Sequence, residues 1–158
     1  HKNNSKINNE SLELLESAAK SGYDDAYYWL GVSQPEAKLA AYYFEKAQGT
    51  GGYGLLALVS AAEIYFKGND VPKDFDKAQA IFSKAAKQHV GNLNRGIPEP
   101  PGEWWSNAKW FRAISSITVL APRYGVKFQT TNGNHEIIQI DPKIHLSDKE
   151  LLSRKRKN

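Results

Sequence analysis

The chain has 158 residues, 41% of them hydrophobic, and a formal net charge of +4. This length and composition are those of one domain that can bury a sizeable core. The sequence contains no cysteine, which excludes disulfides, thiol nucleophiles and cysteine-ligated metal sites. No segment approaches the roughly 20 apolar residues that a membrane-spanning helix requires.

The positive charge is concentrated at the C-terminus, where Arg154, Lys155, Arg156 and Lys157 carry as many charges as the formal net charge. Nucleic-acid-binding domains usually carry a basic face instead, so we expect no nucleic-acid partner. We interpret the tail as a solvated chain end, with a membrane-surface or nuclear-address role as the alternative. Because methionine is absent, we expect that a signal peptide, lipoprotein signal or anchor was removed upstream.

Three short helices are predicted in the first third of the chain. The first carries leucines and alanines up to Gly22, with Asn9 or Ser11 as its N-cap. A brief join at residues 32–35 separates the second helix from the third. The apolar and small residues of the three segments are Leu12, Leu14, Leu15, Ala18 and Ala19, then Ala26, Leu30 and Gly31, then Ala40, Tyr43, Phe44 and Ala47.

Residues 56–88 predict a helix, a glycine turn and a second helix. Alanines recur on one face of each helix, where small side chains let two helix backbones approach closely. These are Ala57, Ala61 and Ala62 in the first helix and Ala78, Ala85 and Ala86 in the second. Gly68 can adopt the left-handed conformation that ends a helix, and Asp74 can cap the next one.

This unit resembles a Sel1-like repeat, a relative of the tetratricopeptide repeat. The matching positions are Ala57, Tyr65, Gly68, Val71, Asp74, Lys77, Ala78, Phe82, Lys84, Ala85 and Ala86. Ala61 and Ala62 depart from the pattern, which has leucine and glycine there. An earlier copy begins at Ala26, and half a copy precedes it. The resemblance implies a solenoid of helical hairpins over residues 1–90, made of a half-repeat and two repeats.

The remaining chain has a different character. Residues 91–102 hold three prolines and three glycines and are predicted to be a connector. Residues 103–120 predict a helix that caps the solenoid. Asn132-Gly133 predicts a β-hairpin with strands at 126–131 and 135–140. Ser147 and Glu150 fit a capping box that starts a last helix. Residues 103–158 are expected to pack on the same domain, so the fold class is mainly α with a small C-terminal β-hairpin.

Motifs for catalysis, metals or cofactors are absent from the sequence. The four histidines have no metal-ligand spacing, and we interpret them as structural, with His89 at a helix end. Asp24 and Asp25 are interpreted as N-cap and loop positions. The glycine-rich segment 49–54 is interpreted as a turn between helical hairpins, with a phosphate cradle as the alternative. We therefore expect a protein that is not an enzyme and has no metal or cofactor.

Aromatic residues are the candidates for a binding surface. Consecutive aromatic residues spread around a helix, so some of those at 27–29 and 42–44 must reach solvent. Exposed tyrosine and tryptophan commonly anchor protein interfaces. The candidate protein-binding residues are Tyr28, Trp29, Tyr42, Trp104 and Trp105. The alternative is that these residues pack beneath the C-terminal segment or the tryptophan-rich helix.

The resemblance implies a function in protein binding. Sel1-like families include adaptors, secretion-linked surface proteins and immunity proteins, among them proteins that counteract type VI secreted phospholipases. We expect an immunity protein that binds and neutralises a secreted antibacterial effector, in the periplasm or envelope, or alternatively in the cytoplasm. The alternative function is a scaffold or adaptor in envelope assembly or signalling. A more distant alternative is a cell-wall or glycan hydrolase that would use Glu103 and Glu136.

Overall fold

Helices make up most of the structure, and a two-stranded antiparallel sheet completes it. The computed structural model describes residues 9–94, 112–113, 115–131 and 134–157. Its elements are α1 (Asn9–Lys20), α2 (Ala26–Val32), α3 (Ala37–Phe44), α4 (Gly52–Lys67), α5 (Phe75–Asn94), the 3₁₀ helix η2 (Ala121–Tyr124), β1 (Val126–Thr131), β2 (Asn134–Ile140) and α7 (Asp148–Lys157). Residues 112–113 and 115–120 are also helical.

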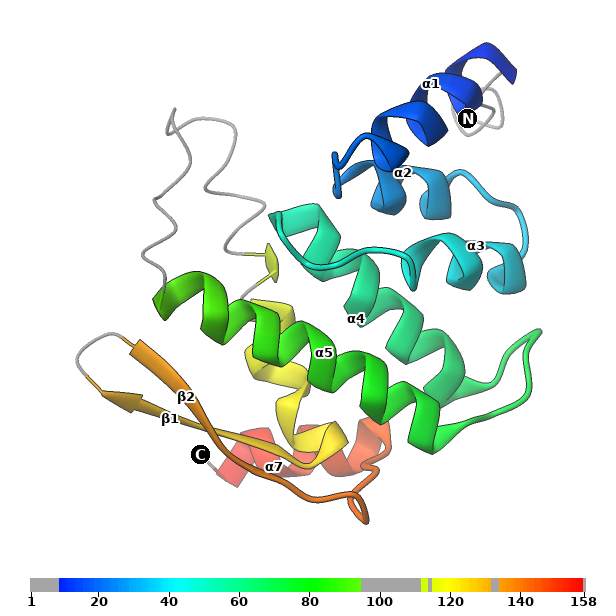
Figure 1. The fold of residues 1–158 in the computed structure, drawn as a ribbon. Helices are drawn as coiled ribbons and strands as arrows, with labels where there is room; N and C mark the ends of the chain where they lie inside the picture. The colour runs from blue at the N-terminus through cyan, green and yellow to red at the C-terminus, as the bar shows by residue number, and fades with distance from the viewer. Residues whose placement is uncertain (1–8, 95–111, 114, 132–133, 158) are drawn as a thin grey trace.

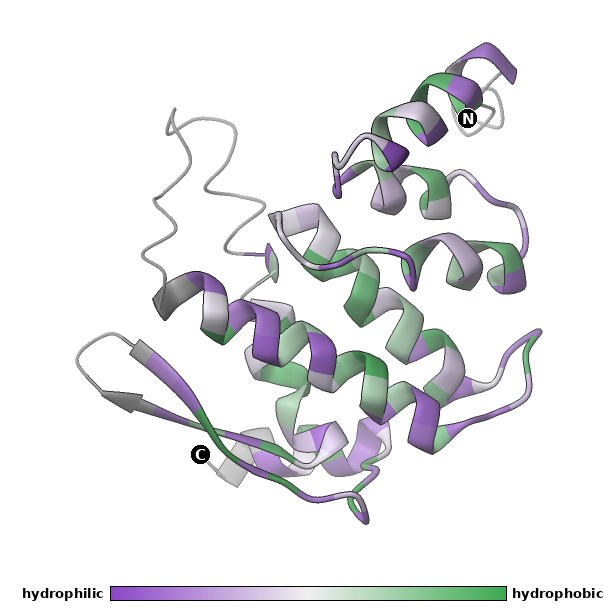
Figure 2. Ribbon diagram, in the orientation of Figure 1, coloured by the Kyte–Doolittle hydropathy of each residue, from purple (hydrophilic) through white to green (hydrophobic). Residues whose placement is uncertain are grey.

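Each helix from α1 to α5 packs against the next one along the chain, and β2 lies against α5 (Figure 1). Helix α4 is apolar along most of its length (Figure 2), and its residues from Leu55 to Val59 are all buried. The main core surrounds α4 and α5 and extends to η2 and the hairpin. A smaller cluster around Ala19, Ala26 and Leu30 joins α1 to α2.

The α4–α5 hairpin forms as the sequence predicts. Gly68 ends α4 at φ 72°, and its N–H donates to the carbonyl of Ile64 at 3.0 Å. A Cβ atom at Gly68 would lie 2.8 Å from the Cβ of Lys73, so a glycine is needed for space as well as for conformation. The Asp74 carboxylate accepts the N–H of Lys77 at 3.0 Å and caps α5.

Small residues set the distances between the helices. The six alanines predicted on the contact faces of α4 and α5 are fully buried: Ala57, Ala61, Ala62, Ala78, Ala85 and Ala86. Between α2 and α3, a Cβ atom at Gly31 would lie 2.1 Å from the ring of Phe44. These positions let the helix backbones approach closely, so the predicted contact faces are confirmed.

The two predicted strands are confirmed. They pair from Val126 with Ile140 to Thr131 with Asn134, with a register shift between Lys127 and Phe128. Their inward side chains pack on the main core. The predicted Asn132-Gly133 turn lies outside the described residues.

Buried polar contacts attach the C-terminal segment to α4 and α5. The Arg123 side chain is 1% exposed. It donates to Glu63 at 2.6 Å and also to Asp148, while its Nε donates to the Leu146 carbonyl at 2.9 Å. Its guanidinium carbon lies 4.4 Å from the centroid of the Phe66 ring. Such a buried cation is tolerated because carboxylates and a carbonyl surround it.

Three expectations need adjustment. Helix α5 continues to Asn94, so the connector does not begin at Gly91, and His89 lies inside the helix. Asn92 holds this extension, because its amide donates to the Gly49 carbonyl at 3.2 Å and accepts from Gln88 at 2.9 Å. The rest of the connector, residues 95–102, and most of the predicted 103–120 helix lie outside the described residues. Ser11 lies within α1, which begins at Asn9.

The last helix begins with the predicted capping box. The N–H of Ser147 donates to Glu150 at 3.0 Å, and the N–H of Glu150 donates to the Ser147 hydroxyl at 3.2 Å. These bonds satisfy two backbone donors that would otherwise lack a partner at the helix start. Helix α7 then runs to Lys157, so the basic tail is helical through Lys157.

Candidate protein-binding surface

Trp29 forms an exposed aromatic surface on α2. Its side chain is 41% exposed, and its ring centroid lies 5.0 Å from that of Tyr53 on α4. Tyr28 supports both rings, because its own ring stacks on Tyr53 at 5.0 Å and meets Trp29 edge-on at 5.3 Å. Val32, one helical turn further on, is also exposed. We call Trp29, Val32 and Tyr53 the Trp29 patch.

Tyr28 itself is not a surface anchor. Its side chain is 9% exposed and belongs to the main core, where its ring lies 5.9 Å from that of Phe44. The interpretation of Tyr28 as a residue that contacts a partner is therefore corrected. Its packing fixes the orientation of Trp29, since aromatic pairs at these distances attract one another.

A second exposed surface lies on α3. Leu39 and Tyr42 are one helical turn apart, and Tyr42 is 54% exposed. The Lys46 ammonium lies 4.6 Å from the centroid of the Tyr42 ring. A hydrogen bond with the Tyr42 side chain raises the pKa of Lys46 above its usual range, so the ammonium stays charged. We call Leu39, Tyr42 and Lys46 the Tyr42 patch. Of the other candidates, Trp104 and Trp105 lie outside the described residues.

The glycine-rich segment after α3 is occupied by a carboxylate of the protein itself. Asp24 accepts the backbone N–H groups of Gln48 at 2.7 Å, Gly49 at 2.8 Å and Thr50 at 3.1 Å. Converging backbone N–H groups of this kind form an anion site. Asp24 is only 7% exposed, so a phosphate could bind here only by displacing a buried carboxylate. The alternative interpretation of this segment as a phosphate-binding loop is therefore wrong.

Asp25 has a related structural role. It precedes α2 without making a side-chain capping bond, and it accepts the N–H of Gly54 at 2.9 Å. A Cβ atom at Gly54 would lie 1.9 Å from Asp24, and one at Gly51 would lie 2.3 Å from Asp25. The two aspartates therefore join the start of α2 to the start of α4. Asp25 therefore occupies the N-cap position of α2 as predicted, but its side chain bonds to Gly54 on α4 and makes no capping bond to α2.

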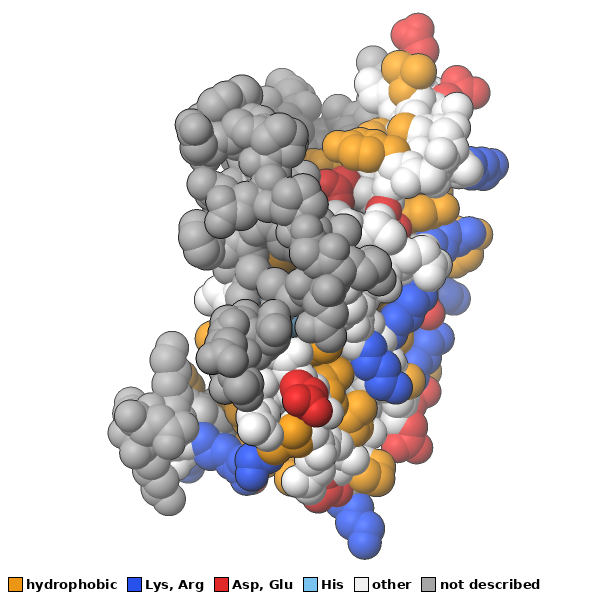
Figure 3. Space-filling model, turned by 60° about the vertical axis from the view of Figure 1, so that its left-hand side comes forward, with side chains coloured by type: hydrophobic (Ala, Val, Ile, Leu, Met, Phe, Trp, Pro, Cys, Tyr) orange, Lys and Arg blue, Asp and Glu red, His pale blue; other side chains and the backbone are white. Residues whose placement is uncertain are grey.

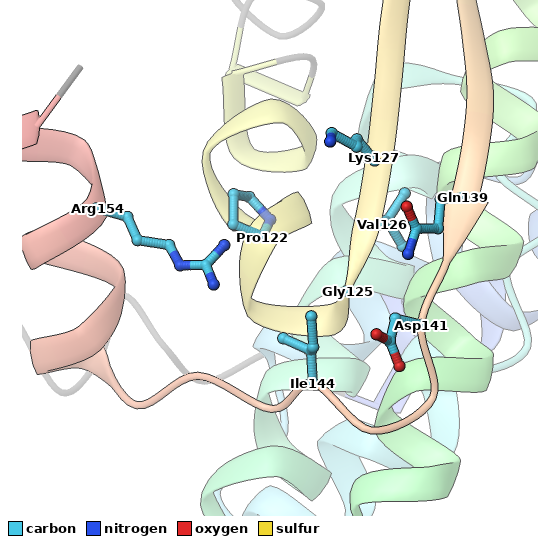
Figure 4. A pocket seen from close by; sticks show the side chains of 8 residues that line it. All are labelled: Pro122, Gly125, Val126, Lys127, Gln139, Asp141, Ile144 and Arg154. Carbon is cyan, nitrogen blue, oxygen red and sulfur yellow. The ribbon is translucent and has the colours of Figure 1, made fainter.

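A hollow of about 260 Å³ lies between η2, the hairpin and α7. Its apolar wall includes Pro122 and Ile144, and its two cationic side chains are Lys127 and Arg154. In Figure 4 the Arg154 side chain extends from its helix toward Pro122. Asp141 also lines the hollow, which lowers its net positive charge. The arrangement offers weak attraction for an anionic group and contains none of the predicted binding residues.

A pair of histidines joins α5 to β2. His89 Nε2 lies 3.1 Å from His135 Nδ1, and His89 is 1% exposed. Burial, followed by the nearby His135, lowers the pKa of His89 to about 4. The sequence predicts a structural role for both histidines but does not predict that they meet. The sequence does indicate that His89 is buried, because it follows Phe82, Ala85 and Ala86 at helical spacing and so lies on the same face of the helix.

The carboxylates considered for a hydrolase are Glu103 and Glu136. Glu136 is exposed on β2, and Glu103 lies outside the described residues. Within the described ranges, no three histidine, aspartate or glutamate side chains gather as a metal-binding group. Over the same ranges, no helix is long and apolar enough to cross a bilayer.

On the face shown in Figure 3, hydrophobic side chains are divided among several patches, and basic side chains gather along the right-hand edge.

Comparisons with protein-family models, with curated proteins and with solved structures find no match for this chain. The exposed aromatic patches are therefore the features of the described surface that best support a functional proposal.

Proposed function

We propose that this chain is a non-catalytic protein-binding module and that it acts as an immunity protein. It would bind a secreted antibacterial effector, such as a phospholipase, and neutralise it by covering its active site or the path to it. The observation that carries the binding role is the exposed Trp29, held in one orientation by Tyr28 and Tyr53. A pre-oriented aromatic side chain loses little conformational entropy when a partner covers it.

The proposal includes a Sel1-like, tetratricopeptide-like solenoid of helical hairpins as the fold. Two observations support it: the consecutive packing of α1 to α5 and the match of the α4–α5 hairpin to the repeat pattern. In such a fold each hairpin needs neighbours to bury its apolar side. The aspartate contacts with the segment after α3 fix one hairpin on the next, so the exposed aromatic residues stand on a rigid support.

The immunity role rests on the resemblance to Sel1-like proteins. The proposed location is the periplasm or envelope, with the cytoplasm as the alternative.

The proposed partner surface includes both the Trp29 patch and the Tyr42 patch. A stable interface usually buries about 1,200–2,000 Å² in total, which exceeds what one tryptophan and its neighbours can supply. Truncation of an aromatic anchor typically costs about 2 kcal/mol or more of binding free energy. Lys46 beside Tyr42 adds a positive charge, which favours an acidic surface on the partner.

The experiment is capture from the native cells with the full chain as bait, followed by an enzymatic assay of what is captured. The proposal expects one-to-one capture of a secreted enzyme whose activity falls when the purified chain is added. Capture of several envelope proteins that are not inhibited would favour an adaptor. Turnover of peptidoglycan by the chain itself would contradict a non-catalytic role.

A further inference from the structure

The contact between α5 and the hairpin contains an enclosed pair of imidazoles. His89 faces His135 across 3.1 Å, and the two ring centroids are 5.2 Å apart. The Phe128 ring lies 6.3 Å from the His89 ring and 5.9 Å from the His135 ring. Because His135 is the second residue of β2, this contact holds the end of the hairpin nearest its turn.

The number of protons on the pair decides whether the contact is favourable. When both rings are neutral, one N–H donates to the nitrogen of the other ring. With two extra protons, both facing nitrogens carry hydrogen and the two cations repel one another. The Nδ1 atom of His89 is buried and has no partner among the described residues, so a charge on this ring is not compensated there.

No described neighbour supplies a compensating charge. Charged side chains on the surrounding elements are exposed at the surface: Lys87 on α5, Lys127 on β1, Glu136 on β2 and Arg112 on the helix that precedes η2. The lowered pKa of His89 has only two causes, burial and the charge of His135. A buried imidazole in this position is therefore neutral at pH 7 and can accept a proton only after water reaches it.

The opposite end of the hairpin is held by groups that do not titrate in this range. The Gln79 amide donates to the Tyr124 carbonyl at 2.7 Å and to the Asp141 carbonyl at 2.8 Å. The N–H of Asp141 donates to the Gly125 carbonyl at 2.9 Å. Acid therefore weakens the attachment at the turn end and leaves the base of the hairpin in place.

We propose that the His89–His135 pair is an acid-sensitive latch, and that mild acid releases the turn end of the hairpin from α5 while its base stays docked. Release exposes the apolar inner face of the hairpin, including Phe128 and Ile137, together with the adjoining face of α5. The latch acts independently of the protein-binding role proposed above.

The test is amide hydrogen exchange of the full chain at pH 7.5 and pH 5.0, corrected for the intrinsic pH dependence of exchange. The latch predicts that protection of residues 128–131 and 134–137 falls at least tenfold at pH 5.0, while the buried part of α4 keeps its protection. In His89→Phe the hairpin should stay protected at both pH values. His145→Gln, which changes a histidine outside the pair, should behave like the wild type.

A second variant serves if His89→Phe does not fold. In His135→Asn the side-chain oxygen can still accept the His89 N–H, but position 135 can no longer carry a positive charge that repels a protonated His89, so the loss of protection should move to lower pH. Equal protection of the wild-type hairpin at pH 7.5 and 5.0 would overturn the proposal. So would loss of protection in α4 at the same pH as in the hairpin, or an unchanged transition in both variants.

Discussion

At the scale of single residues, a few buried polar groups hold together parts of the chain that are distant in sequence. Arg123 reaches Glu63 and Asp148, which are 60 and 25 residues away. Tyr124 donates to the second oxygen of Glu63 at 2.5 Å, and its burial, together with the Glu63 charge, raises its pKa. These contacts fix η2 and the start of α7 on α4.

Arg123→Met should destabilise the protein by about 3 kcal/mol, because it leaves the Glu63 carboxylate, which is only 20% exposed, without its cationic partner. The free energy of unfolding in urea measures this loss. Arg154→Met, which removes an exposed cation on α7, is the matched control and should change stability by less than about 0.5 kcal/mol. Equal effects of the two substitutions would show that the Arg123 contacts do not stabilise the fold.

The stability of the protein should also depend on pH through His89. Its pKa falls from 6.5 to about 4 on folding, so between these values the unfolded chain binds more protons than the folded one. The stabilisation is present in full above pH 6.5 and is lost as the pH falls toward 4. The contribution of His89 to the slope of the unfolding free energy against pH is at most about 1.4 kcal/mol per pH unit. Urea unfolding from pH 7.5 to 4.5 should show this slope in the wild type and a smaller slope in His89→Phe.

At the scale of elements, the turn between α4 and α5 depends on a single glycine. Gly68→Ala should cost about 1–2 kcal/mol, because the left-handed conformation strains any residue with a Cβ atom and because that atom would meet Lys73. Gly22→Ala is a useful comparison. Gly22 also has positive φ, but a Cβ atom there meets nothing within 4 Å. Thermal unfolding should rank Gly68→Ala as the more damaging change; the reverse order would contradict the packing argument.

Local signals predicted most of these elements. Residues close together in the sequence are enough to predict the glycine stop and aspartate cap of the α4–α5 hairpin, the two strands and the Ser147–Glu150 capping box. The structure contains each of these features. The sequence could not show which distant groups meet. Gly91 is helical because Asn92 bonds to Gly49, 43 residues away, and the partner of His89 lies 46 residues away.

The candidate site was predicted only in part. Consecutive aromatic residues guarantee that some are exposed, but helix position alone did not decide between Tyr28 and Trp29. The contact of Tyr28 with Tyr53 and Phe44, on two other helices, buries Tyr28 and leaves Trp29 at the surface. Burial of this kind depends on the packing of α2 against α3 and α4, which no short segment specifies.

At the scale of the whole molecule, the proposed binding role requires that the aromatic patches stand on a fixed framework. The helices pack consecutively, and Asp24 and Asp25 bond the segment after α3 and the start of α4 to the start of α2. A partner that covers Trp29 and Tyr42 would therefore meet a surface that is already arranged for contact, which lowers the entropic cost of association.

The affinity of the purified chain for the captured effector, measured for the wild type and three variants, tests the binding role most directly. Trp29→Ala and Tyr42→Ala should each weaken binding at least tenfold while leaving thermal stability nearly unchanged. Tyr23→Ala removes a side chain that is 56% exposed but lies outside both patches, and it should bind like the wild type. Wild-type affinity in both patch variants, or equal losses in all three, would contradict the account.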